Sequence, residues 1–463
     1  MFRYYLLLGL RSLRRNPALT ALMILTLAIG VAASVSTLTI LHVMSGNPIA
    51  HKSDRLLVPL LDVGMALNYV PGVKQPFQQQ STYKDSVAYL RSGPGVRRTA
   101  IYDISGAVEG AKRDDPVVEL TGVATTSDYF AMFEVPFLYG NGWTPAHDER
   151  ASRVAVLSRA KAEAIYGEKV DPVGKRFRSW GEEFTVVGVV GAWNPTPRYT
   201  NLTNGSGGHF RGEDQVFIPL NTAVSLELRG AGNTSCSRDS GVGYKGLLES
   251  DCVWIQAWFE LASAADRPAA QAWLDAYAAE QQRGGRLERK APNQLFNVME
   301  WLEYMEVVRP DNKIAVWLAF GFLALCIVNT MGLLLAKFST RAAEVGVRRA
   351  LGAGQGAIFR QFLTETAVIG LAGGLLGLAL AFASLWLIRR QSQDLSAVAH
   401  MDWSMLLATF LIAVVAAIVA AVILLATDAG SNTDVADYIR DNVNDQVDAI
   451  KQFIEEHTSS GGN

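Results

Sequence analysis

Four stretches of the chain contain no Asp, Glu, Lys or Arg and are long enough to cross a bilayer as helices. They lie at residues 18–44, between Lys313 and Lys337, between Glu365 and Arg389, and between Asp402 and Asp428. A spanning helix needs roughly 20 apolar residues, so each stretch is a predicted span. The first exceeds the apolar core of a cleavable signal, usually about 7–15 residues, and we interpret it as a retained span.

Basic residues flank these spans unevenly. Four arginines precede the first span, and the segment between the second and third spans has one acid, Glu344, against five basic residues: Lys337, Arg341, Arg348, Arg349 and Arg360. The positive-inside rule places both segments in the cytoplasm, so residues 45–312 are expected outside. Arg389 and Arg390 then fall on the outer side, against the rule.

The pattern divides the chain into consecutive segments. Residues 1–17 form an expected cytoplasmic amphipathic helix, with a plain basic anchor as the alternative. The predicted spans are residues 18–44, 313–336, 362–388 and 405–427. Between and after them we expect an external domain at 45–312, a cytoplasmic segment at 337–361, an external loop at 389–404 and an acidic tail at 428–463.

The external domain has the mixed patterning of an α+β fold. Residues 116–123 alternate apolar and polar side chains, and 154–157 and 184–190 are short apolar runs, so all three are predicted strands. Residues 81–91 and 268–282 have helical start and stop signals. The fold class is therefore an α-helical membrane protein with four transmembrane helices and a large α+β domain inserted between helices 1 and 2.

No catalytic or metal-binding pattern emerges from the sequence. Gly167 to Lys175 is spaced too widely for a phosphate loop, and Arg176 stands where Ser or Thr would hold magnesium. The six histidines are scattered, and Asn204 breaks a nucleophile-elbow frame around Ser206. We expect no catalytic site, metal or cofactor in this chain, and no nucleic-acid partner. The net charge of −2 and mean hydropathy of +0.15 average over two different halves.

The cysteines and small residues give further expectations. Cys236 and Cys252 share the external domain, where oxidising conditions permit a disulfide, with two free thiols as the alternative. Cys326 lies in the second span as a packing residue. Asn329 and Thr330 are expected to hydrogen-bond between helices rather than mark a pathway. Three span glycines predict a close helix contact, within the chain or at a dimer: Gly373, Gly374 and Gly377.

An ordered set of motifs resembles a known family. The segments 121–130 (TGVATTSDYF), 135–140 (VPFLYG), 154–158 (VAVLS), 171–175 (DPVGK) and 184–190 (FTVVGVV) resemble the periplasmic core domain of MacB-type ABC permeases. The later membrane half resembles the FtsX-type permease domain. Residues 341–353 (RAAEVGVRRALGA) resemble the cytoplasmic segment on which the ATPase pushes in this family.

The resemblance implies a location, partners and a site. It implies a bacterial inner membrane protein that pairs with a second permease, alike or different, above a cytoplasmic ABC ATPase dimer that binds ATP and Mg, with a periplasmic membrane-fusion adaptor and the lipid bilayer as further partners. The implied ATPase-coupling residues are Arg341, Glu344, Gly346, Arg348, Arg349 and Gly352. The alternative is a basic loop that sets topology and binds anionic lipid.

The implied function is ATP-driven motion of the periplasmic domain, for export or for extraction of a substrate from the periplasmic side. The alternatives are an FtsX-like transducer that controls a cell-wall hydrolase, or a lipoprotein-release permease. The large external domain favours transport. The acidic tail departs from the family pattern, and we interpret it as a partner-binding element or a foreign segment joined near Ala426.

Overall fold

The computed structural model describes residues 16–67, 69–70, 79–109, 118–202, 210, 212–290, 293–339, 347, 350–351, 355–391 and 452. Contacts between Cα atoms divide the chain into two compact units. The helical unit contains residues 1–41, 310–387 and 400–463, and the α+β domain contains residues 42–309 with 388–399. We describe each unit by itself.

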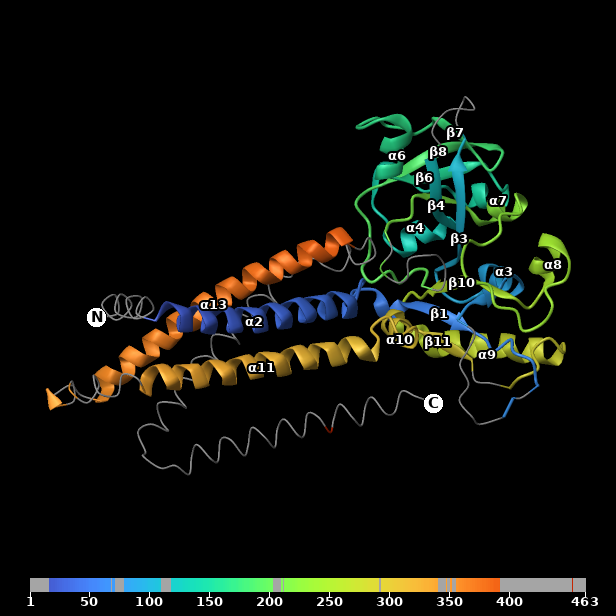
Figure 1. The fold of residues 1–463 in the computed structure, drawn as a ribbon. Helices are drawn as coiled ribbons and strands as arrows, with labels where there is room; N and C mark the ends of the chain where they lie inside the picture. The colour runs from blue at the N-terminus through green and yellow to red at the C-terminus, as the bar shows by residue number, and fades with distance from the viewer. Residues whose placement is uncertain are drawn as a thin grey trace. The chain divides into compact units, whose positions relative to one another are not determined.

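The helical unit has three long helices in its described part: α2 (Pro17–Ser45), α11 (Pro310–Ser339) and α13 (Gln355–Gln391) (Figure 1). All three are long and apolar enough to cross a membrane. The fourth predicted span, the predicted helix at 1–17 and the acidic tail lie outside the described residues, apart from residues 16–17 of the helix and residue 452 in the tail.

Apolar side chains join the three helices. In one cluster Val31 and Val35 of α2 pack with Leu323 of α11 and Ala381 of α13. A second cluster joins α2 to Leu334 and Ile369 through Met23 and Leu27. Because these α2 residues recur every three or four positions, they form one face of the helix.

An 11-stranded sheet forms the centre of the α+β domain. Its main order is β11-β1-β10-β3-β4-β9-β6-β8-β5, with β2 on β10 and β7 on β8. The strands are β1 Leu56–Leu60, β2 Ser81–Thr82, β3 Arg97–Val108, β4 Val118–Thr125, β5 Phe137–Gly140, β6 Val154–Ser158, β7 Arg176–Ser179, β8 Glu182–Val190, β9 Val216–Pro219, β10 Val253–Glu260 and β11 Gln294–Phe296. The pairs β4–β9 and β6–β8 are parallel, and the other pairs are antiparallel.

Short helices and turns connect the strands. They are η1 Ser53–Arg55, α3 Tyr83–Ser92, α4 Asp128–Met132, α5 Pro145–Glu149, α6 Arg159–Tyr166, α7 Leu220–Ser225, α8 Gly243–Glu249, η3 Ala264–Asp266, α9 Arg267–Arg283 and α10 Val298–Tyr304. Thr82 caps α3 by accepting the Asp85 N–H, one residue after the serine that the sequence suggested as its start. This described part of the domain confirms the α+β class.

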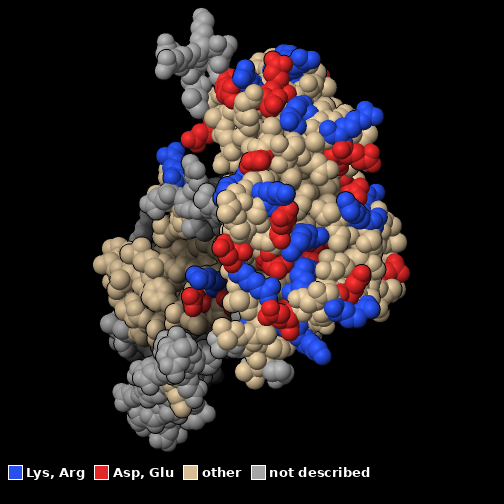
Figure 2. All heavy atoms as spheres, turned by 90° about the vertical axis from the view of Figure 1, so that its right-hand side faces the viewer, with Lys and Arg blue, Asp and Glu red and all other residues tan. Residues whose placement is uncertain are grey.

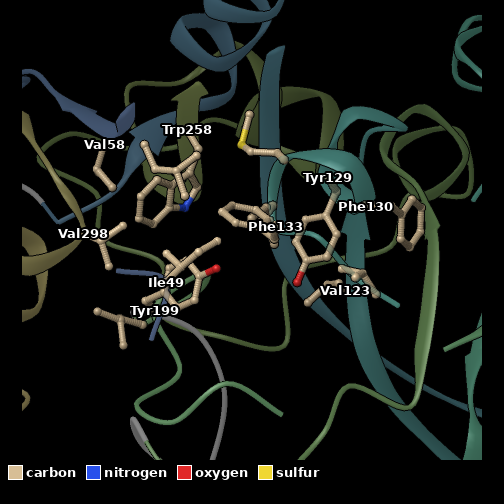
Figure 3. Packing of buried hydrophobic residues seen from close by; sticks show 14 of the residues in the cluster. Ile49, Val58, Val123, Tyr129, Phe130, Phe133, Tyr199, Trp258 and Val298 are labelled. Atoms are coloured by element: carbon tan, nitrogen blue, oxygen red, sulfur yellow. The ribbon is translucent and has the colours of Figure 1, made fainter. Parts of the chain in front are cut away.

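Aromatic side chains fill the largest apolar core of the domain (Figure 3). The Phe133 ring meets the Trp258 ring edge to face, with centroids 5.6 Å apart, and meets Tyr129 at 4.9 Å. Trp258 lies on β10, whose eight residues are all buried. The Trp258 indole N–H donates to the Thr200 carbonyl at 2.9 Å, so this buried ring has its polar atom paired.

The first and last strands of the domain lie side by side. β1 pairs antiparallel with β11, with Val58 opposite Phe296 and Leu60 opposite Gln294. Since β1 follows α2 and β11 precedes α11 along the chain, the connection after α2 and the connection before α11 both leave from one part of the sheet.

The surface of the domain carries mixed charge. On the face shown in Figure 2, Lys and Arg are interspersed with Asp and Glu. No extended basic patch of the kind that binds phosphate backbones is seen among the described residues drawn there.

Candidate functional site

The six predicted coupling residues lie outside the described residues: Arg341, Glu344, Gly346, Arg348, Arg349 and Gly352. Of their segment the structure describes three residues, in which the Leu351 N–H donates to the Val347 carbonyl at 3.0 Å. The Val347 and Leu351 side chains are 60% and 82% exposed. The described turn therefore presents apolar side chains beside the predicted charged positions.

An ion pair joins the two helices that flank this segment in the sequence. Lys337 near the end of α11 pairs with Glu365 of α13, and their side chains are 0% and 1% exposed. A charge withdrawn from water is costly unless it is paired, and a charge inside a membrane unit is a functional candidate by default. In the sequence, Lys337 and Glu365 mark the ends of apolar runs, and Lys337 adds to the basic charge that sets the orientation, but neither indicates a partner. The missed signal was a pair of opposite charges at the facing ends of consecutive spans.

The span glycines make contacts within the chain. A Cβ at Gly377 would lie 2.8 Å from the Ala28 carbonyl oxygen, and one at Gly373 would lie 2.9 Å from the Leu27 Cβ. A Cβ at Gly30 would likewise meet Cys326 at 3.1 Å. Of the two alternatives left open by the sequence, the structure has the intramolecular one for Gly373 and Gly377, because α13 approaches α2 there too closely for larger side chains.

Hydroxyl groups provide polar contacts between the helices. The Ser36 and Ser384 hydroxyls are 2.8 Å apart, and Ser34 Oγ lies 3.0 Å from the Ala319 carbonyl oxygen. These interhelical contacts were missed from the sequence. Thr330, which was predicted in this role, donates instead to the Cys326 carbonyl of its own helix at 2.7 Å. Asn329 is exposed in the described structure.

A buried ion pair fixes the beginning of the α+β domain. Lys52 Nζ lies 2.8 Å from Glu260 Oε1, and both side chains are 3% exposed. Lys52 also donates to the Met132 carbonyl at 2.7 Å, and Arg97 binds the other oxygen of Glu260 at 3.0 Å. Lys52 therefore ties the segment that follows α2 to β10 and to the end of α4.

A second set of polar contacts fixes the end of the domain. The Asn297 side-chain amide donates to the Asp54 carboxylate at 3.0 Å, which joins η1 to the start of α10. Asn297 and Glu300 form a reciprocal capping box, and Arg267 donates to both oxygens of Glu300 at 2.9 and 2.6 Å. Burial raises the pKa of Glu300, but the bonds from Arg267 and from the Asn297 N–H outweigh it and lower that pKa below 4.5.

The disulfide expected from the sequence is present in the structure between Cys236 and Cys252. Cys252 immediately precedes β10, and the Ser235 and Val253 backbones exchange two hydrogen bonds. Cys326 is free and buried. In the described part of the chain, no group of three or more His, Cys, Asp or Glu is arranged to hold a metal ion.

Two protein families match the chain. The MacB-like periplasmic core domain matches residues 20–277, and the FtsX-like permease C-terminal domain matches residues 316–427. The second match includes the predicted coupling segment and the predicted fourth span.

Two relatives of similar sequence are named as ATP-binding/permease proteins for export. The macrolide export ATP-binding/permease protein MacB of Bdellovibrio bacteriovorus is 22% identical over 82% of this chain and 54% of its own length. The pyoverdine export ATP-binding/permease protein PvdT of Pseudomonas syringae pv. tomato is 24% identical over 79% of this chain and 49% of its own length. The chain thus spans about half the length of these curated relatives.

A solved structure, the periplasmic region of MacB from Actinobacillus actinomycetemcomitans, covers 54% of this chain and 92% of its own length at 12% identity, with a TM-score of 0.32. That score is too low to carry an argument. The family matches are decisive, because the first spans more than half of the chain and the second covers the later membrane half. The chain belongs to the MacB/FtsX-type ABC transporter permeases.

Proposed function

We propose that this chain is a permease subunit of the bacterial inner membrane that transmits ATP-driven motion to its periplasmic domain and so drives export, or extraction, of a substrate from the periplasmic side. A separate cytoplasmic ABC ATPase dimer binds ATP and Mg, and the coupling segment around Glu344 receives its motion. A second permease and a periplasmic membrane-fusion adaptor complete the assembly. This chain contributes no catalytic group.

The observation that carries the proposal is the buried Lys337–Glu365 pair. The pair joins α11 to α13 on either side of the coupling segment, residues 341–353. A push on that segment therefore displaces both helices together instead of spreading them apart. Separating the pair would pull apart two charges that are withdrawn from water, so the joined arrangement is strongly preferred.

The base of the α+β domain supports the same proposal. β1 pairs with β11, and Asn297 bonds to Asp54 at 3.0 Å, so the segments that follow α2 and precede α11 are joined to each other within the domain. Lys52 and Glu260 extend this connection to β10. Motion delivered along α2 or α11 thus reaches the domain as movement of a single body.

The cargo proposed for this chain is a small molecule, because relatives of similar sequence are named for macrolide and pyoverdine export. The alternatives are FtsX-like control of a cell-wall hydrolase and lipoprotein release. Recovery of an adaptor with the tagged chain supports export. Recovery of a hydrolase or a lipoprotein carrier supports the corresponding alternative.

Glu344→Lys tests the coupling role. The change keeps the segment basic, so membrane insertion and contact with anionic lipid are expected to persist. The tagged chain is purified from its native membrane, and the co-purifying ATPase is quantified by mass spectrometry and by ATP hydrolysis. We expect loss of the ATPase or of substrate-stimulated hydrolysis.

The matched control is Glu168→Lys, the same change at an exposed position of the α+β domain. It is expected to retain both the ATPase and its stimulation. If Glu344→Lys inserts normally and behaves like the control, Glu344 has no part in coupling and the proposal loses its assigned contact.

A further inference from the structure

A cleft of about 570 Å³ opens in the α+β domain between α3, α5 and the start of α7. Its floor is formed by Arg98 of β3 and residues 126–128. A volume of this size is typical of sites for small organic ligands, roughly 300–1,000 Å³. Neither the coupling segment nor the domain base described above contributes to it.

The α3 wall is amphipathic. Tyr83, Val87, Leu90 and Arg91 all line the cleft and recur at helical spacing, so they form one face of α3. The three apolar side chains are half-buried, whereas Arg91 is exposed. Leu220 at the start of α7 adds a buried apolar group on the other side. The cleft therefore has an apolar α3 wall with a cation at one end, facing a second apolar group from α7.

The guanidinium groups of Arg91 and Arg98 have N–H donors that make no hydrogen bond with a described residue. Arg91 has no hydrogen bond or ion pair with any described residue. Arg98 Nη1 donates to the Gly93 carbonyl at 2.6 Å, and its remaining guanidinium N–H groups have no partner in the described part of the domain. Burial raises the pKa of the Tyr83 phenol and the positive charge of Arg91 opposes that shift, which puts this guanidinium within electrostatic reach of the phenol.

Unlike the two guanidinium groups, two of the carboxylates that line the cleft are engaged in hydrogen bonds within the domain. Asp148 accepts the Ser127 N–H and the Trp143 indole N–H, both at 2.7 Å. Asp128 accepts the Arg98 backbone N–H at 3.0 Å. These two acids therefore hold the floor and the α5 wall in place. Glu149 is exposed beside them, and its charge disfavours a ligand with more than one negative charge.

We propose that this cleft binds an amphipathic organic monocarboxylate. Its carboxylate is received by Arg91 and Arg98, because guanidinium groups match carboxylate geometry with paired hydrogen bonds. Its apolar body lies along Val87, Leu90 and Leu220. The proposal does not rest on the coupling function, since binding in the cleft requires neither ATP nor an ATPase.

The test is equilibrium dialysis of 4-phenylbutyrate against the full chain in lipid nanodiscs, with empty nanodiscs subtracting partition into lipid. 4-Phenylbutylamine, which has the same apolar body and the opposite charge, is the matched probe. We expect retention of the carboxylate and at least about tenfold weaker retention of the amine, since one charged hydrogen bond suffices for such a difference.

Variants then locate the site. Arg91→Gln is expected to weaken retention of 4-phenylbutyrate about tenfold, and Val87→Glu, which places a negative charge on the apolar wall, is expected to abolish it. Arg283→Gln removes an exposed arginine at the end of α9, outside the cleft, and is expected to retain the probe like the unmodified chain. Resistance to limited proteolysis verifies that each variant is folded.

The proposal is overturned if the amine and the carboxylate are retained equally, or if Arg91→Gln binds like Arg283→Gln. It is also overturned if the unmodified chain retains no probe. In that last case the two arginines would instead suit an acidic side chain of a protein partner.

Discussion

Lys337 of α11 and Glu365 of α13 form an ion pair that is almost wholly withdrawn from solvent, with side chains 0% and 1% exposed. The two residues are the first charged positions that follow and precede the apolar runs of their helices on the side of the coupling segment. A buried pair contributes little net stability compared with an apolar pair, but breaking it by removing one partner is expensive. The pair therefore acts mainly by keeping the end of α11 at Lys337 next to α13 at Glu365.

Neutralising one member of this pair is expected to destabilise the helical unit. Lys337→Met or Glu365→Gln each leave one buried charge, and each should cost about 3–5 kcal/mol. The double variant should cost much less than the sum, because no unpaired charge remains. Thermal unfolding in nanodiscs, followed by tryptophan fluorescence, measures both. Strictly additive losses would mean that the two side chains do not interact.

Gly377→Ala is expected to disturb the contact between α13 and α2. The added Cβ would lie 2.8 Å from the Ala28 carbonyl oxygen and from the Val31 Cβ, which forces the helices apart. Overpacking of this kind costs about 1–3 kcal/mol. Gly332→Ala is the matched control, since a Cβ there meets nothing within 4 Å. Equal melting temperatures for the two variants would contradict the close approach.

The disulfide predicts a labelling pattern and a stability loss. In denatured, unreduced protein, a thiol reagent should modify Cys326 alone, and a Cys326→Ser variant should take up none. Replacing Cys236 and Cys252 together by serine should cost about 3 kcal/mol, the amount expected for a loop of this length. Modification of all three cysteines in protein recovered from its membrane would rule out the bond.

The topology predicts the side of the membrane on which inserted reporters lie. Alkaline phosphatase should be active when fused at Gly205, and green fluorescent protein should fluoresce when fused at Gly354, because the basic segments hold residues 337–361 in the cytoplasm. A fusion at Asn312 should behave as one at Gly205. Activity of the same reporter at both Gly205 and Gly354 would overturn the proposed orientation.

Local pattern was enough to predict part of this fold. The charge-free runs located α2, α11 and α13 because a span must be apolar along its whole length. The apolar runs at 154–157 and 184–190 became β6 and β8, and the capped pattern at 268–282 became α9. In each case the residues of the element itself are enough to explain its secondary structure.

Contacts between distant segments were not predictable in this way. β10 escaped notice because all of its residues are buried, so it lacks the alternation of a half-exposed strand. Its charged residue Glu260 is accounted for by Lys52 and Arg97, both far away in the sequence. Lys337 and Glu365 likewise looked like ordinary boundary charges, because a single sequence does not reveal which charged residues at the ends of helices face one another.

Acid is expected to loosen the end of the α+β domain through Glu300. Its carboxylate receives both bonds from Arg267 and caps α10, and its pKa is lowered below 4.5 in the folded protein. A lowered folded-state pKa means that the unfolded chain binds the proton more tightly. The stability from Glu300 is therefore complete above its unfolded pKa, near 4.5, and is lost as the pH falls through the lower folded value.

Glu300→Gln isolates this contribution, since the amide keeps the size of the side chain without the charge. The melting temperature of the unmodified chain should exceed that of the variant at pH 7, and the difference should shrink as the pH falls below the unfolded pKa, near 4.5. Glu303→Gln, in the same helix and without a described ion pair, should show no such convergence. A constant difference between the unmodified chain and Glu300→Gln across this range would show that the carboxylate stabilises the domain by packing rather than through its charge.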